Sequence, residues 1–225
     1  MDRSAFSSAA ASIGLSLSNT QLDQFQLFED RLYKANEVMN LTRVPRDECW
    51  LRHFLDSLLF HDLIPANASL LDIGTGPGFP AWPIACVRPD VKVTALDSSG
   101  KMLGFLQQNP LPNLQCVLDR AEEWSVRNKF DVVTGRALAP FAIQMELSAT
   151  PCKASGAVIP MRTPADGEEI RKFVGRGLGL KLEKIVKREL PGTDIVRVYP
   201  IFRKVGKAHP TYPRSWSEMK RSPLQ

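Results

Sequence analysis

A short segment rich in glycine constrains the fold of this chain more than any other feature. Residues 70–73 form an apolar run interrupted only by Asp72, and Gly-Thr-Gly-Pro-Gly follows at 74–78. Glycine adopts positive φ without strain and lets a ligand approach the backbone closely. Amides at the start of a following helix add hydrogen bonds and a partial positive charge. The segment therefore predicts a buried strand, a ligand-binding turn and a helix. The candidate binding residues in this turn are Gly74, Gly76, Gly78 and Phe79.

A second carboxylate, Asp97, ends the next apolar run at residues 91–96. Acids at the tips of two neighbouring strands, with a glycine loop between them, form a nucleoside-binding arrangement. A dinucleotide site would instead show G-x-G-x-x-G with an acid about 20 residues further on. An acidic loop suits the ammonium and sulfonium groups of S-adenosylmethionine, whereas it would repel a pyrophosphate. We therefore expect Asp72 and Asp97 to bind S-adenosylmethionine, Asp97 through both ribose hydroxyls. A tight turn without a ligand is the less favoured alternative.

The length and composition of the chain are those of an ordinary globular protein. Its 225 residues, 44% of them hydrophobic, suffice for one domain with a full core. No apolar run approaches a membrane span and the first residues lack a signal-peptide pattern, so we expect a cytoplasmic protein without membrane contact. The four cysteines are widely spaced, no C-x-x-C pair occurs and only three histidines are present. This usage predicts reduced thiols and no metal site.

Positive charge accumulates toward the C-terminus. The net charge is +5 and the isoelectric point is about 9.1. From residue 203 onward the single acid Glu218 stands against six basic residues: Arg203, Lys204, Lys207, Arg214, Lys220 and Arg221. A basic end of this kind attracts a polyanion. A solvated, flexible tail explains the charge equally well.

Apolar periodicity predicts two helices and then an alternation of strands and helices. Helical spacing marks residues 20–36, where Thr20 and Asp23 resemble a capping box, and residues 47–62. Strands are expected near 69–73, 91–96, 114–118, 130–134, 154–159, 181–189 and 194–202. Helices are expected near 79–88, 100–108, 138–149 and 166–177.

This order predicts an α/β fold with a doubly wound, largely parallel sheet and helices on both faces. The last two strands are separated by a Pro-Gly turn and should form an antiparallel hairpin. Seven strands ending in a hairpin match the Rossmann-like class I methyltransferases, here with an N-terminal helical extension. We divide the chain into this extension at 1–66, an S-adenosylmethionine-binding core at 67–205 and a basic C-terminal tail at 206–225.

Several short motifs resemble one family in their order and spacing. They are Asn40-Leu41-Thr42, Arg52-His53-x-x-Asp56-Ser57, residues 72–80, Val87-Arg88-Pro89, Leu96-Asp97-Ser98, Arg120-Ala121-Glu122-Glu123, Arg136-Ala137, Tyr212-Pro213-Arg214 and residues 220–224. They are spread over most of the chain and are similar to the bacterial small-subunit ribosomal RNA guanine-N7 methyltransferases, known as RsmG or GidB. The resemblance implies S-adenosyl-L-methionine as cofactor and 16S ribosomal RNA, or the small ribosomal subunit, as partner.

The resemblance also implies cofactor contacts and shows two departures. The positions that match the family's cofactor contacts are Gly74, Phe79, Ala121, Glu122 and Arg136. The family's glycine after Pro80 is Ala81 here, which a helix accepts. After the strand expected near 154–159, the family has Lys-Gly and this chain has Met161-Arg162. Whether this position contacts the base or a phosphate, as the resemblance implies, is therefore open. Because these cofactor motifs lie between Asp72 and Arg136, we expect cofactor binding not to need the C-terminal segment.

The residues present also narrow the reaction. After strand four stands Thr-Gly-Arg-Ala at 134–137, not the Asn/Asp-Pro-Pro-aromatic motif of exocyclic-amine methylation. Cys152 is better explained as a structural thiol than as a nucleophile for pyrimidine carbon 5. Guanine N7 carries an exposed lone pair and needs no general base, so alignment with the methyl group supplies most of the catalysis. Arg136 and His53 are the candidate catalytic residues, and His53 is explained more readily as structural or RNA-contacting.

Two other functions are alternatives to this one. A catalytically silent RNA-binding or ribosome-assembly protein could keep the same fold. A nucleotide-dependent dehydrogenase of the NAD type is disfavoured by the G-x-G-x-G loop and by Asp72. We expect the protein to be a monomer.

Overall fold

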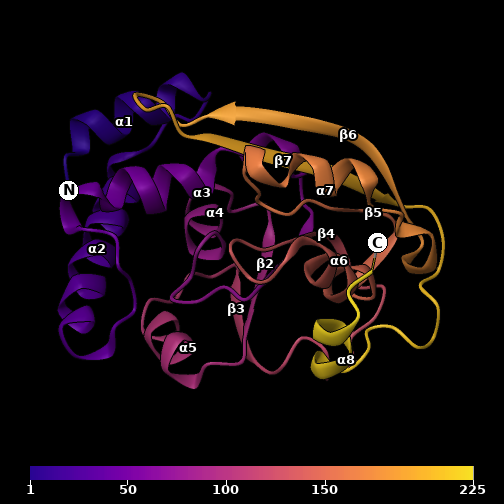
Figure 1. Ribbon diagram of the computed structural model, residues 1–225. Helices are drawn as coiled ribbons and strands as arrows, with labels where there is room; N and C mark the ends of the chain where they lie inside the picture. Colours follow the sequence, from indigo (N-terminus) through magenta and orange to yellow (C-terminus); the bar gives the residue numbers. More distant parts are fainter. Residues whose placement is uncertain (225) are drawn as a thin grey trace.

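The computed structural model describes residues 1–224, which are organised around a seven-stranded sheet (Figure 1). The strands follow the order β3-β2-β1-β4-β5-β7-β6, and β7 runs antiparallel to both of its neighbours. Their bounds are β1 Ser69–Ile73, β2 Lys92–Asp97, β3 Leu114–Leu118, β4 Phe130–Thr134, β5 Cys152–Val158, β6 Leu180–Glu189 and β7 Val196–Lys204. The predicted doubly wound sheet with a terminal hairpin is therefore confirmed.

The strand register brings the predicted ligand-binding residues to one edge of the sheet. Asp72 lies opposite Ala95 of β2 and Thr134 of β4, so the carboxyl ends of β1, β2 and β4 are adjacent. The strand order reverses between β1 and β4, and ligands of doubly wound sheets bind at such a switch point. Beyond the strands, a bridge between Arg136 and Met161 and another between Arg162 and Val198 extend the sheet at this edge.

Helices cover both faces of the sheet. Successive residues of a strand point to opposite faces, so Leu70 of β1 enters one apolar core and Leu71 enters the other. The first face carries α1 Arg3–Ser12, α2 Asn19–Met39, α4 Ala81–Val87 and α5 Gly100–Gln107. The second face carries α6 Phe141–Ala149, α7 Gly167–Lys172 and α8 Trp216–Arg221. Within residues 1–224, no helix combines the length and the apolar character that crossing a membrane requires.

The N-terminal region differs from the sequence prediction at three points. Helix α1 was not predicted, and its Phe6 is fully buried against Phe25 of α2. The capping box of α2 is formed by Ser18 and Gln21 rather than by Thr20 and Asp23, because the helix begins one residue earlier than expected. The predicted helix at 47–62 is instead a series of short pieces: a 3-10 turn at Arg46–Glu48, a π-helical turn at Trp50–Leu55, α3 Asp56–Leu58 and a 3-10 turn at His61–Leu63.

The π-helical turn at Trp50–Leu55 buries a polar residue. Helices of that kind are rare and occur mostly as single turns at functional sites. Here the turn buries the polar side chain of His53 beside the apolar side chains of Phe54 and Leu55. Asp56, which follows directly, is also buried. These two polar residues of the stretch are therefore buried in the fold.

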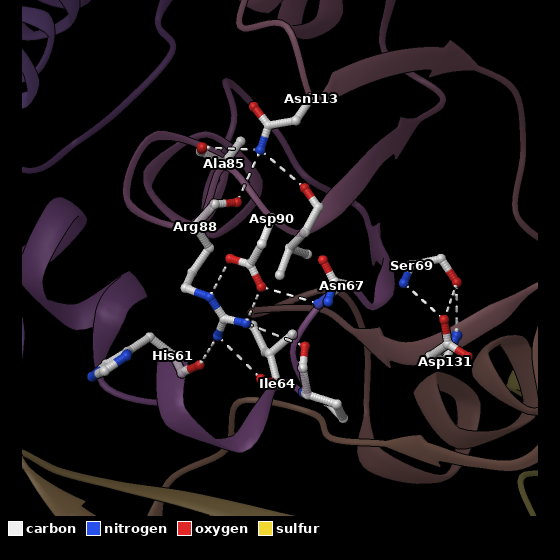
Figure 2. Close-up of polar contacts among 11 residues, drawn as sticks. His61, Ile64, Asn67, Ser69, Ala85, Arg88, Asp90, Asn113 and Asp131 are labelled. Atoms are coloured by element: carbon white, nitrogen blue, oxygen red, sulfur yellow. Dashed lines mark hydrogen bonds and ion pairs between the residues drawn. The ribbon is translucent and has the colours of Figure 1, made fainter.

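The Val87-Arg88-Pro89 motif is structural. Arg88 donates hydrogen bonds to the carbonyls of His61 and Ile64, at 2.8 and 3.0 Å, and pairs with Asp90 (Figure 2). Asp90 in turn accepts a 3.0 Å hydrogen bond from the amide of Asn67. Arg88 therefore fixes the end of the N-terminal helical region beside the amino end of β1.

The C-terminal segment folds back onto the protein. A solvated, flexible tail is therefore the wrong explanation for three of the six basic residues from residue 203 onward. Lys204 is buried and donates to the carbonyls of Ala149 and Leu178. Arg203 pairs with Glu183, and Arg214 pairs with Glu146. The basic residues of this segment that are exposed and have no ion pair within residues 1–224 are Lys207, Lys220 and Arg221.

Candidate active site

A cavity of about 420 Å³ lies at the carboxyl edge of the sheet, beside the switch point between β1 and β4. Its size falls within the range of roughly 300–1,000 Å³ that small-molecule sites occupy. Four of the nine cofactor residues expected from the sequence line it: Gly74, Asp97, Ala121 and Glu122. The cavity therefore gathers residues that follow β1, β2 and β3, as a nucleoside site requires.

The glycine turn is shaped by backbone conformations that other residues rarely adopt. Gly74, Gly76 and Gly78 have φ values of +70°, +57° and +120°. A Cβ on Gly74 would stand 2.5 Å from Leu138 Cδ1, and both residues line the cavity. Gly76 has open space around the corresponding position. Both glycines are thus required by conformation, and at Gly74 a Cβ would in addition push the Leu138 side chain at the cavity wall out of its position.

Asp97 holds the glycine turn and also faces the cavity. One carboxylate oxygen accepts a 2.8 Å hydrogen bond from the amide of Gly76, and the other accepts one of 2.8 Å from the amide of Ser99. A carboxylate oxygen has about two acceptor positions, so each oxygen keeps one for a ligand hydroxyl. Glu122, which lines the same cavity, is paired with Arg120.

Asp72 lies beneath the turn rather than in the cavity wall. Its carboxylate is fully buried, and Oδ2 accepts a 3.1 Å hydrogen bond from the amide of Ala81. Oδ1 has no hydrogen-bond partner within residues 1–224. Burial raises the pKa of Asp72 to about 7. The hydrogen bond to Asp72 comes from the backbone amide of residue 81. It is therefore kept although this chain has Ala81 where the family has glycine.

A second cavity of about 570 Å³ lies on the other side of Ala137, which lines both cavities. Ala137 has a φ of +52°, which is uncommon for a residue with a side chain. The wall of the second cavity contains four arginines, Arg52, Arg136, Arg162 and Arg197, against two acids, Asp56 and Asp166. The two cavities are therefore neighbours, and the second one suits an anionic ligand.

Arg136 is held from three sides in this second cavity. It donates to Asp56 Oδ2 at 3.2 Å and to His53 Nδ1 at 3.1 Å, and its guanidinium lies 5.3 Å from the ring centroid of Phe79. Arg197 donates to both oxygens of the same Asp56, at 2.6 and 3.1 Å. One buried carboxylate thus positions two arginines at the cavity wall.

His53 is neutral, and both of its ring nitrogens are occupied. Because Arg136 has only donors to offer, Nδ1 accepts, which places the proton on Nε2; Nε2 lies 2.6 Å from Thr42 Oγ1. Burial, together with the charges of Arg136 and Arg52, lowers the pKa of His53 to about 3. His53 therefore has no free lone pair with which to act as a general base, and its contacts assign it to the positioning of Arg136.

Comparison with known proteins identifies the family. Residues 21–185 match the family model described as rRNA small subunit methyltransferase G. This chain belongs to that family. A protein named ribosomal RNA small subunit methyltransferase G from Lachnoclostridium phytofermentans is 36% identical over 99% of this chain and 98% of its own. One with the same name from Lactobacillus johnsonii is 33% identical over the full length of both chains.

Solved structures support the fold of this methyltransferase G family member. The putative methyltransferase in complex with Haloferax volcanii Trm112 aligns with a TM-score of 0.59, covering 81% of this chain and 98% of that one at 12% identity. The M. jannaschii TYW2 structure in complex with AdoMet aligns with a TM-score of 0.53, covering 66% and 73% at 16% identity. Identities this low show the class I methyltransferase fold and nothing finer.

The other predicted positions of this methyltransferase G chain lie outside the first cavity. Gly76 and Gly78 shape the turn, Phe79 stacks on His53, and Arg136 lines the second cavity. Arg162, which follows Met161 at the position of the family's Lys-Gly, donates to the carbonyl of Ala139 and to Gln144, and pairs with Asp166 at 2.6 Å. Its charge therefore lies in the second cavity, although an acid partly neutralises it.

Two of the cavity residues that sequence reasoning missed are Arg197 and Trp216. Arg197 stands in the apolar strand β7, and an isolated arginine in such a strand is the one signal that could have marked it. Trp216 belongs to the C-terminal helix and lines the first cavity. No motif for a cofactor site lies near Trp216.

Proposed function

We propose that this chain transfers a methyl group from S-adenosyl-L-methionine to N7 of a guanine in 16S ribosomal RNA. The observation that carries the proposal is the pair of adjoining cavities that share Ala137. One holds the carboxylate and glycine residues suited to a nucleoside, and the other holds arginines suited to RNA. A methyl group bound in the first would face a base bound in the second.

The residues that line the first cavity suit S-adenosylmethionine. A Cβ on Gly74 would displace the Leu138 side chain in the cavity wall, and Asp97 keeps acceptor positions for the ribose hydroxyls. Ala121 and Glu122 line the same cavity, beyond the end of β3. When bound there, the cofactor supplies an electrophilic methyl group on a sulfonium. The residues around it bind and orient it.

The second cavity suits RNA and a reaction without a general base. Arginine recognises phosphate and guanine edges through paired donors, and Arg136 and Arg197 are held with part of each side chain exposed. The N7 lone pair attacks without losing a proton, so no base is required. His53 is blocked at both nitrogens, and Asp56 and Glu122 are each engaged by arginine. Alignment of the two ligands across Ala137 is what these residues contribute.

The direct test is to map methylated guanine in ribosomal RNA. Small ribosomal subunits, or free 16S RNA, from cells lacking this protein are incubated with the purified chain and S-adenosylmethionine carrying a labelled methyl group. We expect label in 7-methylguanosine at one site, and none with a Gly74→Val variant. Restoration of ribosome assembly without any label would favour the catalytically silent RNA-binding protein instead.

We further propose that the enzyme acts as a monomer in the cytoplasm. All four cysteines, which lie within residues 1–224, are free thiols, and Cys49, Cys86 and Cys152 are buried. This state is the one expected in a reducing compartment. Light scattering coupled to size exclusion tests the oligomeric state.

A further inference from the structure

The C-terminal segment supplies a wall of the first cavity. Trp216, the first residue of α8, lines this cavity together with Ala121, Leu138 and Leu147. Among the described residues that line it, Trp216 is the sole aromatic side chain. Its indole is half-buried and packs against the apolar core of the second sheet face. The expectation that the cofactor residues end at Arg136 therefore leaves out part of the cavity.

Trp216 is held in place by a buried ion pair two residues before it. Arg214 donates from Nη2 to Glu146 Oε2 at 2.6 Å and from its backbone amide to Glu146 Oε1 at 2.8 Å. Glu146 is 1% exposed and precedes Leu147, another cavity residue, on α6. Breaking such a pair leaves an uncompensated buried charge. The contact between Arg214 and Glu146 therefore holds α8 beside α6 (Figure 1).

The other side of α8 is anchored as well. Met219, one turn after Trp216, is fully buried in the same core. The chain entering the helix is tied down by Arg127, whose Nη1 donates to the carbonyl of Tyr212 at 3.0 Å. Anchors before and within the helix leave Trp216 as a fixed part of the cavity wall.

We propose that Trp216 is a cofactor-binding residue and that the C-terminal segment completes the S-adenosylmethionine pocket. The proposal rests on the proposed function, because it assumes that the first cavity holds this cofactor. Adenine is the flat, π-bonded part of the ligand, and aromatic side chains bind nucleobases by stacking without needing specific hydrogen bonds. The ribose end is already assigned to Asp97, so the indole serves the base.

The test measures S-adenosylhomocysteine binding by isothermal titration calorimetry in the full-length chain. We expect Trp216→Ala to weaken binding by about ten-fold to a hundred-fold, as removal of one aromatic–base stack does. Trp216→Phe should keep an affinity within about three-fold of the wild type, because it retains a ring. An unchanged affinity in Trp216→Ala would overturn the proposal. A wild-type chain that binds no S-adenosylhomocysteine would overturn the proposed function instead.

Tryptophan fluorescence gives a second readout that does not depend on how well Trp216→Ala folds. Trp124 is the matched control, because it is also half-buried and packs against the same core but does not line the cavity. We expect S-adenosylhomocysteine to change the emission of the wild type and of Trp124→Phe, and the change to be largely abolished in Trp216→Phe. A full response in Trp216→Phe would place the ligand away from the indole and overturn the proposal.

Discussion

The imidazole of His53 stacks on the ring of Phe79, with the centroids 4.2 Å apart and the planes 3° from parallel. The same imidazole accepts a hydrogen bond from Arg136, whose guanidinium lies over the Phe79 ring. Three separate segments thus meet: the π-helical turn, the glycine turn and the residues after β4. This contact links the cofactor turn directly to the basic cavity.

Replacing His53 should impair methylation without affecting cofactor binding. A hydrogen bond to a charged partner contributes roughly 1.5–3 kcal/mol, so we expect His53→Ala to lower kcat/KM on RNA by about ten-fold to a hundred-fold. His53→Gln should have a smaller effect, because its amide can accept from Arg136 and donate to Thr42. Neither variant should change S-adenosylhomocysteine affinity. Normal methylation by His53→Ala would show that Arg136 needs no support from the imidazole.

Asp72 should make stability depend on pH. Its folded-state pKa of about 7 lies above the ordinary 3.8, so the folded protein binds a proton between these values that the unfolded chain lacks. Stability contributed by this group therefore falls as the pH rises from about 4 to 7. We expect Asp72→Asn to stabilise the ligand-free protein by roughly 1–3 kcal/mol at pH 8 and by little at pH 4. Thermal melts of both proteins across this range test it; a difference independent of pH would contradict the raised pKa.

The two neighbouring glycines should respond differently to alanine. Both substitutions place a side chain at positive φ, at a cost of about 1–2 kcal/mol. Only in Gly74→Ala does the new Cβ collide with Leu138, at the cavity wall. We expect Gly74→Ala to weaken S-adenosylhomocysteine binding at least about ten-fold, and Gly76→Ala by less than about three-fold. Equal effects would mean that the turn's conformation, and not the space before Gly74, governs binding.

Asp97→Ala should affect both cofactor affinity and folding. Removal of charge-assisted hydrogen bonds to the ribose should weaken S-adenosylhomocysteine binding by roughly 1–3 kcal/mol. Because Asp97 also accepts from the amides of Gly76 and Ser99, we expect the ligand-free protein to be destabilised by about 1 kcal/mol or more. Calorimetry and thermal melts measure the two effects separately. An unaltered affinity would show that Asp97 holds only the turn.

The exposed C-terminal cations should contribute to RNA binding. We expect the triple variant Lys207→Glu, Lys220→Glu and Arg221→Glu to bind 16S RNA more weakly. Its plot of log affinity against log salt should be shallower by about 0.7 for each phosphate that is no longer neutralised by a cation. Arg214→Glu is unsuitable for this purpose and should instead destabilise the fold, because Arg214 neutralises the buried Glu146. A triple variant with wild-type affinity at every salt concentration would show that these charges are only solvated.

Much of the fold was predictable because its signals are local. Segments bounded by turn residues, most of them apolar runs, marked all seven strands, and the Pro-Gly turn marked the final hairpin. The three glycines were recognisable because a strand-to-helix turn with positive φ favours glycine, and Asp97 was recognisable because it ends the next apolar run. Helix α1 and the π-helical turn were not predicted, since the burial of Phe6 and of His53 depends on partners elsewhere in the chain.

The sequence by itself determined the alternation of strands and helices, the glycine turn and the family, because each depends on residues that are close together along the chain. The tertiary structure decided which charges are available and what closes the cofactor cavity. Arg197 reaches Asp56 across 141 residues, and Arg214 reaches Glu146 across 68. A buried carboxylate must be paired wherever the fold places it. The residues near it in the sequence do not identify the arginine that pairs with it. The pairing of Arg214 with the buried Glu146 holds the C-terminal segment, predicted as a basic tail, against the protein. There Trp216 of this segment forms part of the cavity wall.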